Sequence, residues 1–352
     1  MEPIPDELLT ERRRRVLGAL VDKHIRTAQP VGSLTLVNEY RLAVSPATIR
    51  IEFGIMEELG LIYQPHRSAG RLPSDLGYRV FVDRILSPQV MRGHWTTVWE
   101  RQLKACADDI VHLLSACCEL LGQTTGYAGF AVLPKKEREK VQAVTFIPLP
   151  SRKVVVTLYG CRQIQKLFTA PTQLPAAQWE AASAWWTERL LGRSVGFLKT
   201  WSPGDDFVVA THQIPAIGLA YEFLKLIADQ KEERLVLTSG VARVLSEPEF
   251  EEGERARRFL SFWDQSRLLA NFFPDQWLQR SAVGETWVSI GSENPMEELR
   301  DCTLVAAPYR IGEAPGGVVG VIGPKRMRYY DALPKVACFA QLVSRTLTFS
   351  LS

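Results

Sequence analysis

Short amphipathic segments dominate the N-terminal part of the chain. In the first of them, one helical face carries Val16, Leu17, Leu20, Val21 and Ile25. Thr10 can cap this segment and Gln29-Pro30 follows it, so the spacing predicts a helix that ends near Ala28. Gly32-Ser33 offers a second cap, and the apolar segment 34–40 after it predicts a helix of about two turns.

A third helix is expected to begin at Ser45-Pro46, because the hydroxyl caps a helix and proline at the first position loses no hydrogen bond. It should run to Leu59, with Gly60 as its terminator. One face is apolar, with Ile49, Phe53 and Met56, and the opposite face carries Ala47, Arg50, Ile51, Gly54 and Glu58. Two helices, a tight turn and a third helix form the helix-turn-helix pattern, in which the third helix enters the major groove of DNA.

Two strand-like segments, 61–64 and 72–74, flank a loop that carries cations. A ribbon of this kind after a helix-turn-helix is a winged helix, whose loop cations contact phosphates or the minor groove. Arg50 is the leading candidate for a guanine contact, and Ala47, Thr48 and Ile51 should face base edges beside it. The other residues that we expect to bind the backbone or a groove are Ser45, His66, Arg67, Ser68 and Arg71.

Longer periodic stretches follow residue 86. Residues 99–121 predict one amphipathic helix. Strands are expected at 127–133, 141–149, 153–160, 285–290, 303–309 and 318–322, and helices at 176–191, 216–227 and 334–348. Strands split by a helical insertion predict an α+β domain with an inserted helical subdomain. The expected boundaries are a winged-helix domain at 1–86, a linker helix region at 87–125, an α+β domain at 126–170 and 246–352, and an insertion at 171–245.

The composition is that of an ordinary globular protein, with 46% hydrophobic and 23% charged residues in a chain of 352. The formal net charge of +3 is too small to indicate nucleic-acid binding by bulk charge, so any such function must lie in a local patch. The N-terminus lacks the apolar core of a secretory signal, and no stretch reaches the ~20 apolar residues of a membrane helix. We therefore expect a cytoplasmic protein, with its six cysteines reduced.

No motif predicts catalysis. The glycines at 316–323 match neither GxGxxG nor GxxxxGK[ST], and Pro324 removes an N–H that a phosphate cradle would use. Nucleophile elbows, HExxH and kinase signatures are absent, and the cysteines and histidines lack the spacing of a zinc site. We expect no enzyme activity, no catalytic or metal-binding residues and no cofactor.

Two groups of motifs carry a family resemblance. The first comprises Ser45-Pro46-Ala47-Thr48-Ile49-Arg50, Glu57-Glu58-Leu59-Gly60-Leu61-Ile62, Gln64-Pro65-His66-Arg67-Ser68-Ala69-Gly70-Arg71-Leu72-Pro73 and Gly77-Tyr78-Arg79. The second comprises Ile290-Gly291-Ser292-Glu293-Asn294, residues 304–309 and Gly320-Val321-Ile322-Gly323-Pro324-Lys325-Arg326-Met327-Arg328-Tyr329. In both groups the chain resembles the heat-inducible transcription repressors called HrcA. Where the family usually has asparagine, this chain has Ile51, which cannot make the bidentate adenine contact of an amide.

The resemblance implies a GAF-like α+β domain with an inserted dimerising region. It also implies repression of chaperone genes, with a chaperonin helping to keep the repressor active. Trp179, Trp185 and Trp186 belong to a dense aromatic group, which is typical of an interface core and equally of an ordinary buried core. The resemblance favours the first interpretation, and we expect these residues to contribute to dimerisation.

The sequence therefore predicts a DNA-binding repressor of heat-shock genes that binds an inverted-repeat operator as a homodimer, so that the symmetry of the protein matches that of the operator. Two alternatives remain. In one, the α+β domain binds a small molecule and shifts the dimer between two geometries, although no polar constellation specifies a ligand. In the other, the winged helix contacts a protein partner and never DNA.

Overall fold

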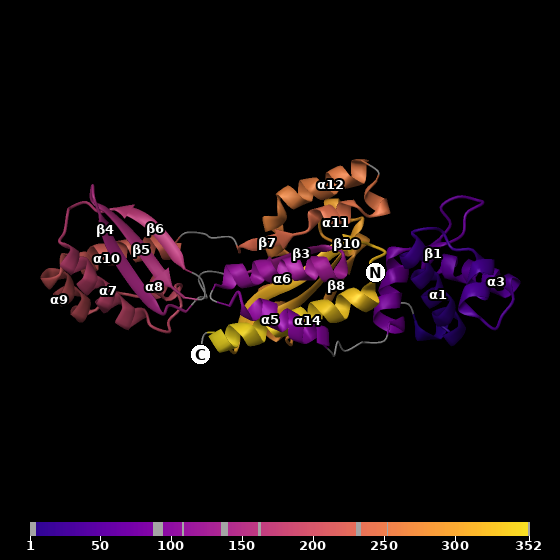
Figure 1. The fold of residues 1–352 in the computed structure, drawn as a ribbon, viewed down its shortest axis with the longest axis horizontal. Coiled ribbons are helices and arrows are strands. Elements are labelled where there is room, and N and C mark those ends of the chain that lie inside the picture. The colour runs from indigo at the N-terminus through magenta and orange to yellow at the C-terminus, as the bar shows by residue number, and fades with distance from the viewer. Residues whose placement is uncertain are drawn as a thin grey trace.

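The computed structural model describes residues 5–86, 94–107, 109–134, 140–160, 163–229, 234–251 and 253–350. Three parts lie in a row along its longest axis (Figure 1). We call residues 5–86 the reader, residues 140–229 the insertion, and the remainder, which lies between the two, the body. No helix in these described ranges is long and apolar enough to cross a membrane.

The reader is a winged helix-turn-helix. Its elements are α1 (Glu11–Thr27), α2 (Ser33–Tyr40), α3 (Pro46–Glu58), β1 (Ile62–Tyr63), β2 (Leu72–Pro73) and α4 (Asp75–Val80), which continues as a π-helical turn (Phe81–Ile85). The caps expected at Thr10 and Gly60 are confirmed, because the Thr10 hydroxyl accepts the N–H of Arg13 at 3.3 Å and Gly60, at φ +69°, follows α3. At the start of α2, Gly32 occupies the cap position and no side chain caps the helix. Strands β1 and β2 pair antiparallel at the base of the wing.

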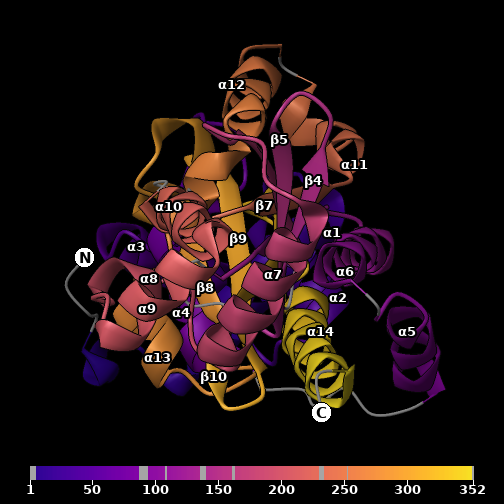
Figure 2. The ribbon, with the colours of Figure 1, turned by 90° about the vertical axis from the view of Figure 1, so that its left-hand side faces the viewer.

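The body is built on a five-stranded antiparallel sheet in the order β7-β3-β10-β9-β8. Its strands are β3 (Ala128–Val132), β7 (Val236–Ser239), β8 (Trp287–Ile290), β9 (Cys302–Ile311) and β10 (Ala314–Pro324). One face packs on α6 (Ile110–Thr125) and α14 (Tyr329–Ser350), and α5 (His94–Lys104) packs against these two helices. The other face packs on the segment that holds α11 (Val241–Leu245), α12 (Gly253–Asp264) and α13 (Asp275–Arg280) (Figures 1 and 2). Both faces are apolar because neighbouring strand residues alternate between two buried clusters.

The insertion has a sheet of its own. Strands β4 (Ala143–Leu149), β5 (Lys153–Tyr159) and β6 (Ile164–Thr169) form an antiparallel meander. Helices α7 (Ala176–Leu190), α8 (Phe197–Thr200), α9 (Asp205–Gln213) and α10 (Pro215–Asp229) complete it. The inner face of the sheet is lined by Val144, Phe146, Val154, Val156 and Leu158, which share a buried cluster with α7 and α10.

The fold class expected from the sequence is confirmed as a winged helix followed by an α+β body with an insertion, but three details are corrected. The insertion begins before β4 rather than at residue 171, because β4–β6 pair with one another instead of joining the body, and it ends before β7 rather than at residue 245. It is therefore mixed α/β rather than helical. The single helix expected at 99–121 is two helices, since the Asp109 side chain caps a new one by accepting the N–H of His112 at 3.2 Å.

Candidate nucleic-acid interface

The outer face of α3 is fully available to a partner. Its side chains at Ala47, Arg50, Ile51 and Glu58 are exposed, and Ile51 retains 66% of its surface. A Cβ placed on Gly54 would meet no atom within 4 Å. The inner face, with Ile49, Phe53 and Met56, is buried against the other helices. The separation of faces expected from the sequence is confirmed.

Two hydroxyls organise the first turn of α3. The Ser45 Oγ accepts the backbone N–H of Thr48 at 3.1 Å, and the two side-chain oxygens lie 3.0 Å apart. Pro46 occupies the first turn, as expected. The Ser45 hydroxyl is therefore used as the helix cap, and Thr48 is half-buried beside it.

A buried carboxylate ties α3 to α1. Glu52, on the inner side of α3, is 6% exposed, and its Oε2 accepts from Nε of Arg13 at 2.9 Å. Arg12 lies 3.6 Å from the same carboxylate, and Arg13 also donates to the carbonyl of Leu8 at 2.5 Å. Two arginines of the first turn of α1, Arg12 and Arg13, thus neutralise Glu52 and hold α3 against α1. A lone glutamate on an apolar helical face is the signal that could have revealed it.

The loop of the wing is shaped by a residue that sequence reasoning missed. The side-chain amide of Gln64 donates to the carbonyls of Arg67 at 3.0 Å and Ala69 at 2.9 Å. At the base of the loop, a Cβ on Gly70 would lie 2.5 Å from the backbone of Val31, so the glycine permits this close approach. The loop is folded back on itself, and His66, Arg67 and Ser68 project as exposed side chains.

Arg71 is held by the protein itself. Its backbone pairs with Val31, and its guanidinium binds Glu57 near the end of α3, with Nη2 at 3.1 Å and Nε at 3.2 Å from the carboxylate. The side chain is 20% exposed. Arg71 therefore fixes the base of the wing against α3, and its charge is largely matched by that of Glu57.

The nine sequence-predicted DNA-binding residues thus fall on two neighbouring elements of the reader. Helix α3 supplies the cap and the groove-sized face, and the wing supplies the exposed side chains of His66 and Arg67. A helix of this kind fits the major groove, while wing cations contact phosphates beside it. Among the described residues, no group of three or more His, Cys, Asp or Glu side chains is arranged to hold a metal ion.

The three tryptophans expected to contribute to dimerisation lie on α7 of the insertion, at the end of the molecule opposite the reader (Figure 1). Trp179 and Trp186 are each 1% exposed and pack inside its core, where the indole N–H of Trp186 donates to the carbonyl of Ile217 at 3.1 Å. Trp185 is half-buried, with the guanidinium of Arg189 3.5 Å above its ring. Of the three, Trp185 alone offers side-chain surface to a partner.

Comparisons with known proteins agree over nearly the whole chain. The family described as "HrcA protein C terminal domain" matches residues 111–332. The chain is 32% identical over 343 residues to the heat-inducible transcription repressor HrcA of Moorella thermoacetica, covering 96% of this chain and 98% of that protein. It is also 32% identical to the repressor of the same name from Synechocystis sp., covering 97% and 98%. A solved structure described as that of a hypothetical protein shares the fold, with a TM-score of 0.63, 22% identity, and coverage of 97% of this chain and 99% of that one.

Proposed function

The chain belongs to the HrcA family of heat-inducible transcription repressors, and from that premise we propose that it represses heat-shock chaperone genes by binding an inverted-repeat operator as a homodimer. The observation that carries the proposal is the exposed outer face of α3 beside a preshaped, cationic wing. A repressor of this kind acts on cytoplasmic DNA and needs no catalytic centre.

In this proposal the residues of α3 recognise the bases. Arg50 presents five N–H donors in a fork that matches guanine O6 and N7, a contact worth about 1–3 kcal/mol of discrimination. Ala47 and Ile51 present apolar surface of the kind that contacts a thymine methyl. Thr48 faces the base edges beside Arg50, and Ser45 brings the N-terminus of α3 to a phosphate, where backbone N–H groups and the helix dipole favour an anion.

In this proposal the wing makes most of the contacts with the DNA backbone. His66, Arg67 and Ser68 are the exposed groups of the loop, and we assign them to phosphates or the minor-groove edge. Arg71 acts with Glu57 and sets the angle of the wing, so its own contribution to phosphate binding is smaller than that of Arg67.

Dimerisation is assigned to the insertion. The outer face of its sheet carries a row in which Ile147 pairs with Val155 and Val155 with Leu167, and Ile147 and Leu167 are 49% and 55% exposed. Two protomers joined there place two readers for two half-sites. Trp179 and Trp186 support this region from its core, and Trp185 lies at its surface.

We also propose that a chaperonin assists the repressor. Exposed apolar side chains such as Ile147 and Leu167 are the kind of surface that a chaperonin binds, and a chaperonin that keeps unassembled chains from aggregating raises the amount of chain that can form the active dimer. Misfolded protein that occupies the chaperonin would then lower the active fraction and release transcription.

The test is an anisotropy titration of the pure protein against the inverted repeat upstream of chaperone genes and against a scrambled duplex, at two salt concentrations, with and without chaperonin. We expect tight binding to the repeat and weak, salt-sensitive binding to the scramble. Arg50→Ala should weaken binding to the repeat, whereas Arg26→Ala, which removes an exposed arginine from α1, should not. Equal weak binding of a folded dimer to both duplexes would contradict the proposal.

A further inference from the structure

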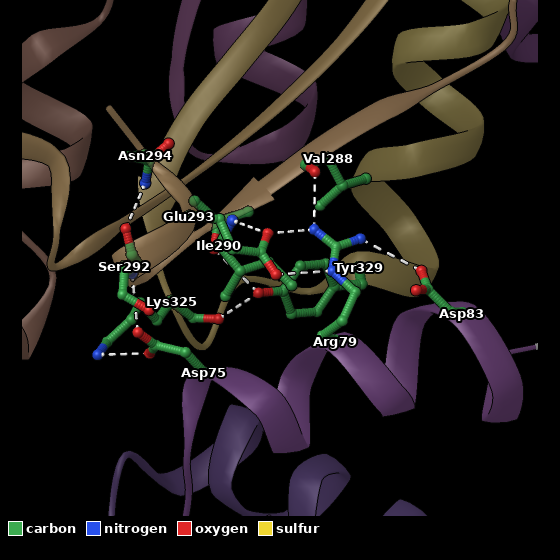
Figure 3. A network of polar contacts seen from close by, with 12 residues as sticks. Asp75, Arg79, Asp83, Val288, Ile290, Ser292, Glu293, Asn294, Lys325 and Tyr329 are labelled. Atoms are coloured by element: carbon green, nitrogen blue, oxygen red, sulfur yellow. Dashed lines mark hydrogen bonds and ion pairs between the residues drawn. The ribbon is translucent and has the colours of Figure 1, made fainter. Parts of the chain in front are cut away.

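The two motif groups that lie far apart in the sequence meet where the reader contacts the body (Figure 3). Asp75 and Arg79 project from α4, and Ser292, Glu293 and Lys325 face them from the end of the body's sheet. We call these five residues the junction.

Arg79 reaches the body with Nε and Nη2 of its guanidinium, while Nη1 binds Asp83 within the reader at 3.2 Å. Its Nε donates to Oε1 of Glu293 at 2.8 Å, Nη2 donates to the other oxygen of that carboxylate, and Nη2 also donates to the carbonyl of Val288 at 2.7 Å. Glu293 at the same time accepts the N–H of Ile290 at 2.9 Å, so its carboxylate is fixed by its own backbone. A bidentate pair of this kind is directional, because both nitrogens and both oxygens must lie in one plane. The hydrogen bonds from Arg79 to Glu293 raise the pKa of the arginine further, so the guanidinium stays charged.

Asp75 makes a second link beside the first. Its two oxygens accept from Nζ of Lys325 and from the backbone N–H of Ser292, each at 2.8 Å. A Cβ on Gly291, which has φ +52°, would lie within 2.5 Å of that carboxylate, so glycine permits the approach. Burial disfavours the charged form of Asp75, but the bonds from Lys325 and Ser292 outweigh burial and lower its pKa.

These links surround a small aromatic contact. The rings of Tyr78 and Phe81 pack against Tyr329 of α14, with centroids 5.9 and 6.5 Å apart. Two cavities flank it, one of ≈ 390 Å³ that Arg79 helps to line and one of ≈ 490 Å³ that Lys325 helps to line. Apolar packing is not directional, so the angle of the reader is defined by the polar links, which are the two at the junction and a hydrogen bond from Nη1 of Arg326 to the carbonyl of Ile25 at 3.1 Å.

We propose that Arg79 and Asp75 are positioning residues, which fix the orientation of the reader on the body and thereby set the spacing between operator half-sites that the homodimer accepts. The inference rests on the proposed function. Each base pair added between half-sites rotates one of them by about 34° and moves it by about 3.4 Å. A dimer whose readers are held by directional contacts binds well at few spacer lengths, whereas a dimer whose readers can rotate binds at many.

The experiment measures affinity for inverted repeats whose central spacer is shortened or lengthened by one to five base pairs, with full-length wild type, Arg79→Ala, Asp75→Asn and Glu293→Gln. Arg26→Ala is the matched control, because it breaks an ion pair with Asp22 inside α1 and leaves the junction intact. For wild type we expect affinity to fall on the order of a hundredfold between the best spacer and one changed by half a turn. For the junction variants this ratio should fall to about tenfold or less, with unchanged affinity for a single half-site.

Glu293→Gln separates positioning from contact, because Glu293 carries no positive charge for DNA. If Arg79→Ala broadens the spacer preference and Glu293→Gln does not, Arg79 binds DNA itself and the inference is wrong. It is also wrong if wild type has no spacer preference, if the variants keep the preference of wild type, or if circular dichroism shows that all three variants unfold. A wild type that does not distinguish the repeat from a scrambled duplex refutes the proposed function instead.

Discussion

Arg67→Ala is expected to reduce the slope of log affinity against log salt for operator binding. Arg67 is exposed at the wing, and no carboxylate in the described part of the chain pairs with it. Each phosphate that a protein neutralises contributes about 0.9 to the slope of log affinity against log salt. Two wings in a dimer therefore account for a slope of about 1.8, and between 50 and 200 mM salt the affinity of Arg67→Ala should fall about tenfold less than that of wild type.

Arg71→Ala provides the comparison. Because Glu57 already neutralises Arg71, at 3.1 Å, its removal should change the slope less than half as much, while lowering affinity through a displaced wing. The measurement is an anisotropy titration with the operator duplex at four salt concentrations, with Arg26→Ala as the control. An unchanged slope for Arg67→Ala would remove Arg67 from the contacts, and a larger change for Arg71→Ala than for Arg67→Ala would refute the account of the Arg71–Glu57 pair.

Three further predictions concern α3 and the edge of the reader. Replacing a contacted thymine by uracil removes one methyl group, so the wild type should lose about 0.8 kcal/mol of binding free energy, or about fourfold in affinity, while Ile51→Ala should lose nothing. The measurement is a competition assay with operators that carry a single uracil. Equal losses in both proteins would exclude Ile51 from that contact. Ser45→Ala should lower the free energy of unfolding by about 1 kcal/mol in urea titrations, because the cap to Thr48 is lost, whereas Ser45→Asn should retain most of it. Burial lowers the pKa of His24 below its usual 6.5, although a hydrogen bond with Gln29 opposes this, so the unfolded chain takes up the proton first. Stability should therefore fall as the pH drops below about 6.5, and denaturation curves between pH 5 and 8 should show this fall weakened in His24→Gln.

Local signals carried most of the fold of the reader. Ser45-Pro46 marks the start of α3, Gly60 marks its end, and the spacing of Ile49, Phe53 and Met56 defines its buried face. Each of these signals depends on residues within a few positions of one another, which is why sequence reasoning placed the elements and the exposed face correctly.

Long-range pairing was beyond reach of the same reasoning. Nothing in the alternation of β4–β6 shows whether they extend the sheet of the body or form their own, because each strand pattern is compatible with either partner. The junction is a second case, since Arg79 and Glu293 are separated by 214 positions and each looks like an ordinary surface charge. Glu52 is a third case, because its place on an apolar helical face could indicate a paired charge but not that Arg13, 39 positions away, is the partner.

The strand order of the body also dictates when its parts can form during synthesis. Strand β3 lies between β7 and β10, so one of its edges stays unpaired until β10, the last strand of the chain, has been synthesised. At the ~5–20 residues per second of translation, roughly ten to forty seconds separate the emergence of Val132 from that of its partner Val318. The helices of the reader pack locally and need no such wait, but Glu293 and Lys325 emerge near the end. In a newly made chain, the contacts that aim the reader are therefore among the last to form.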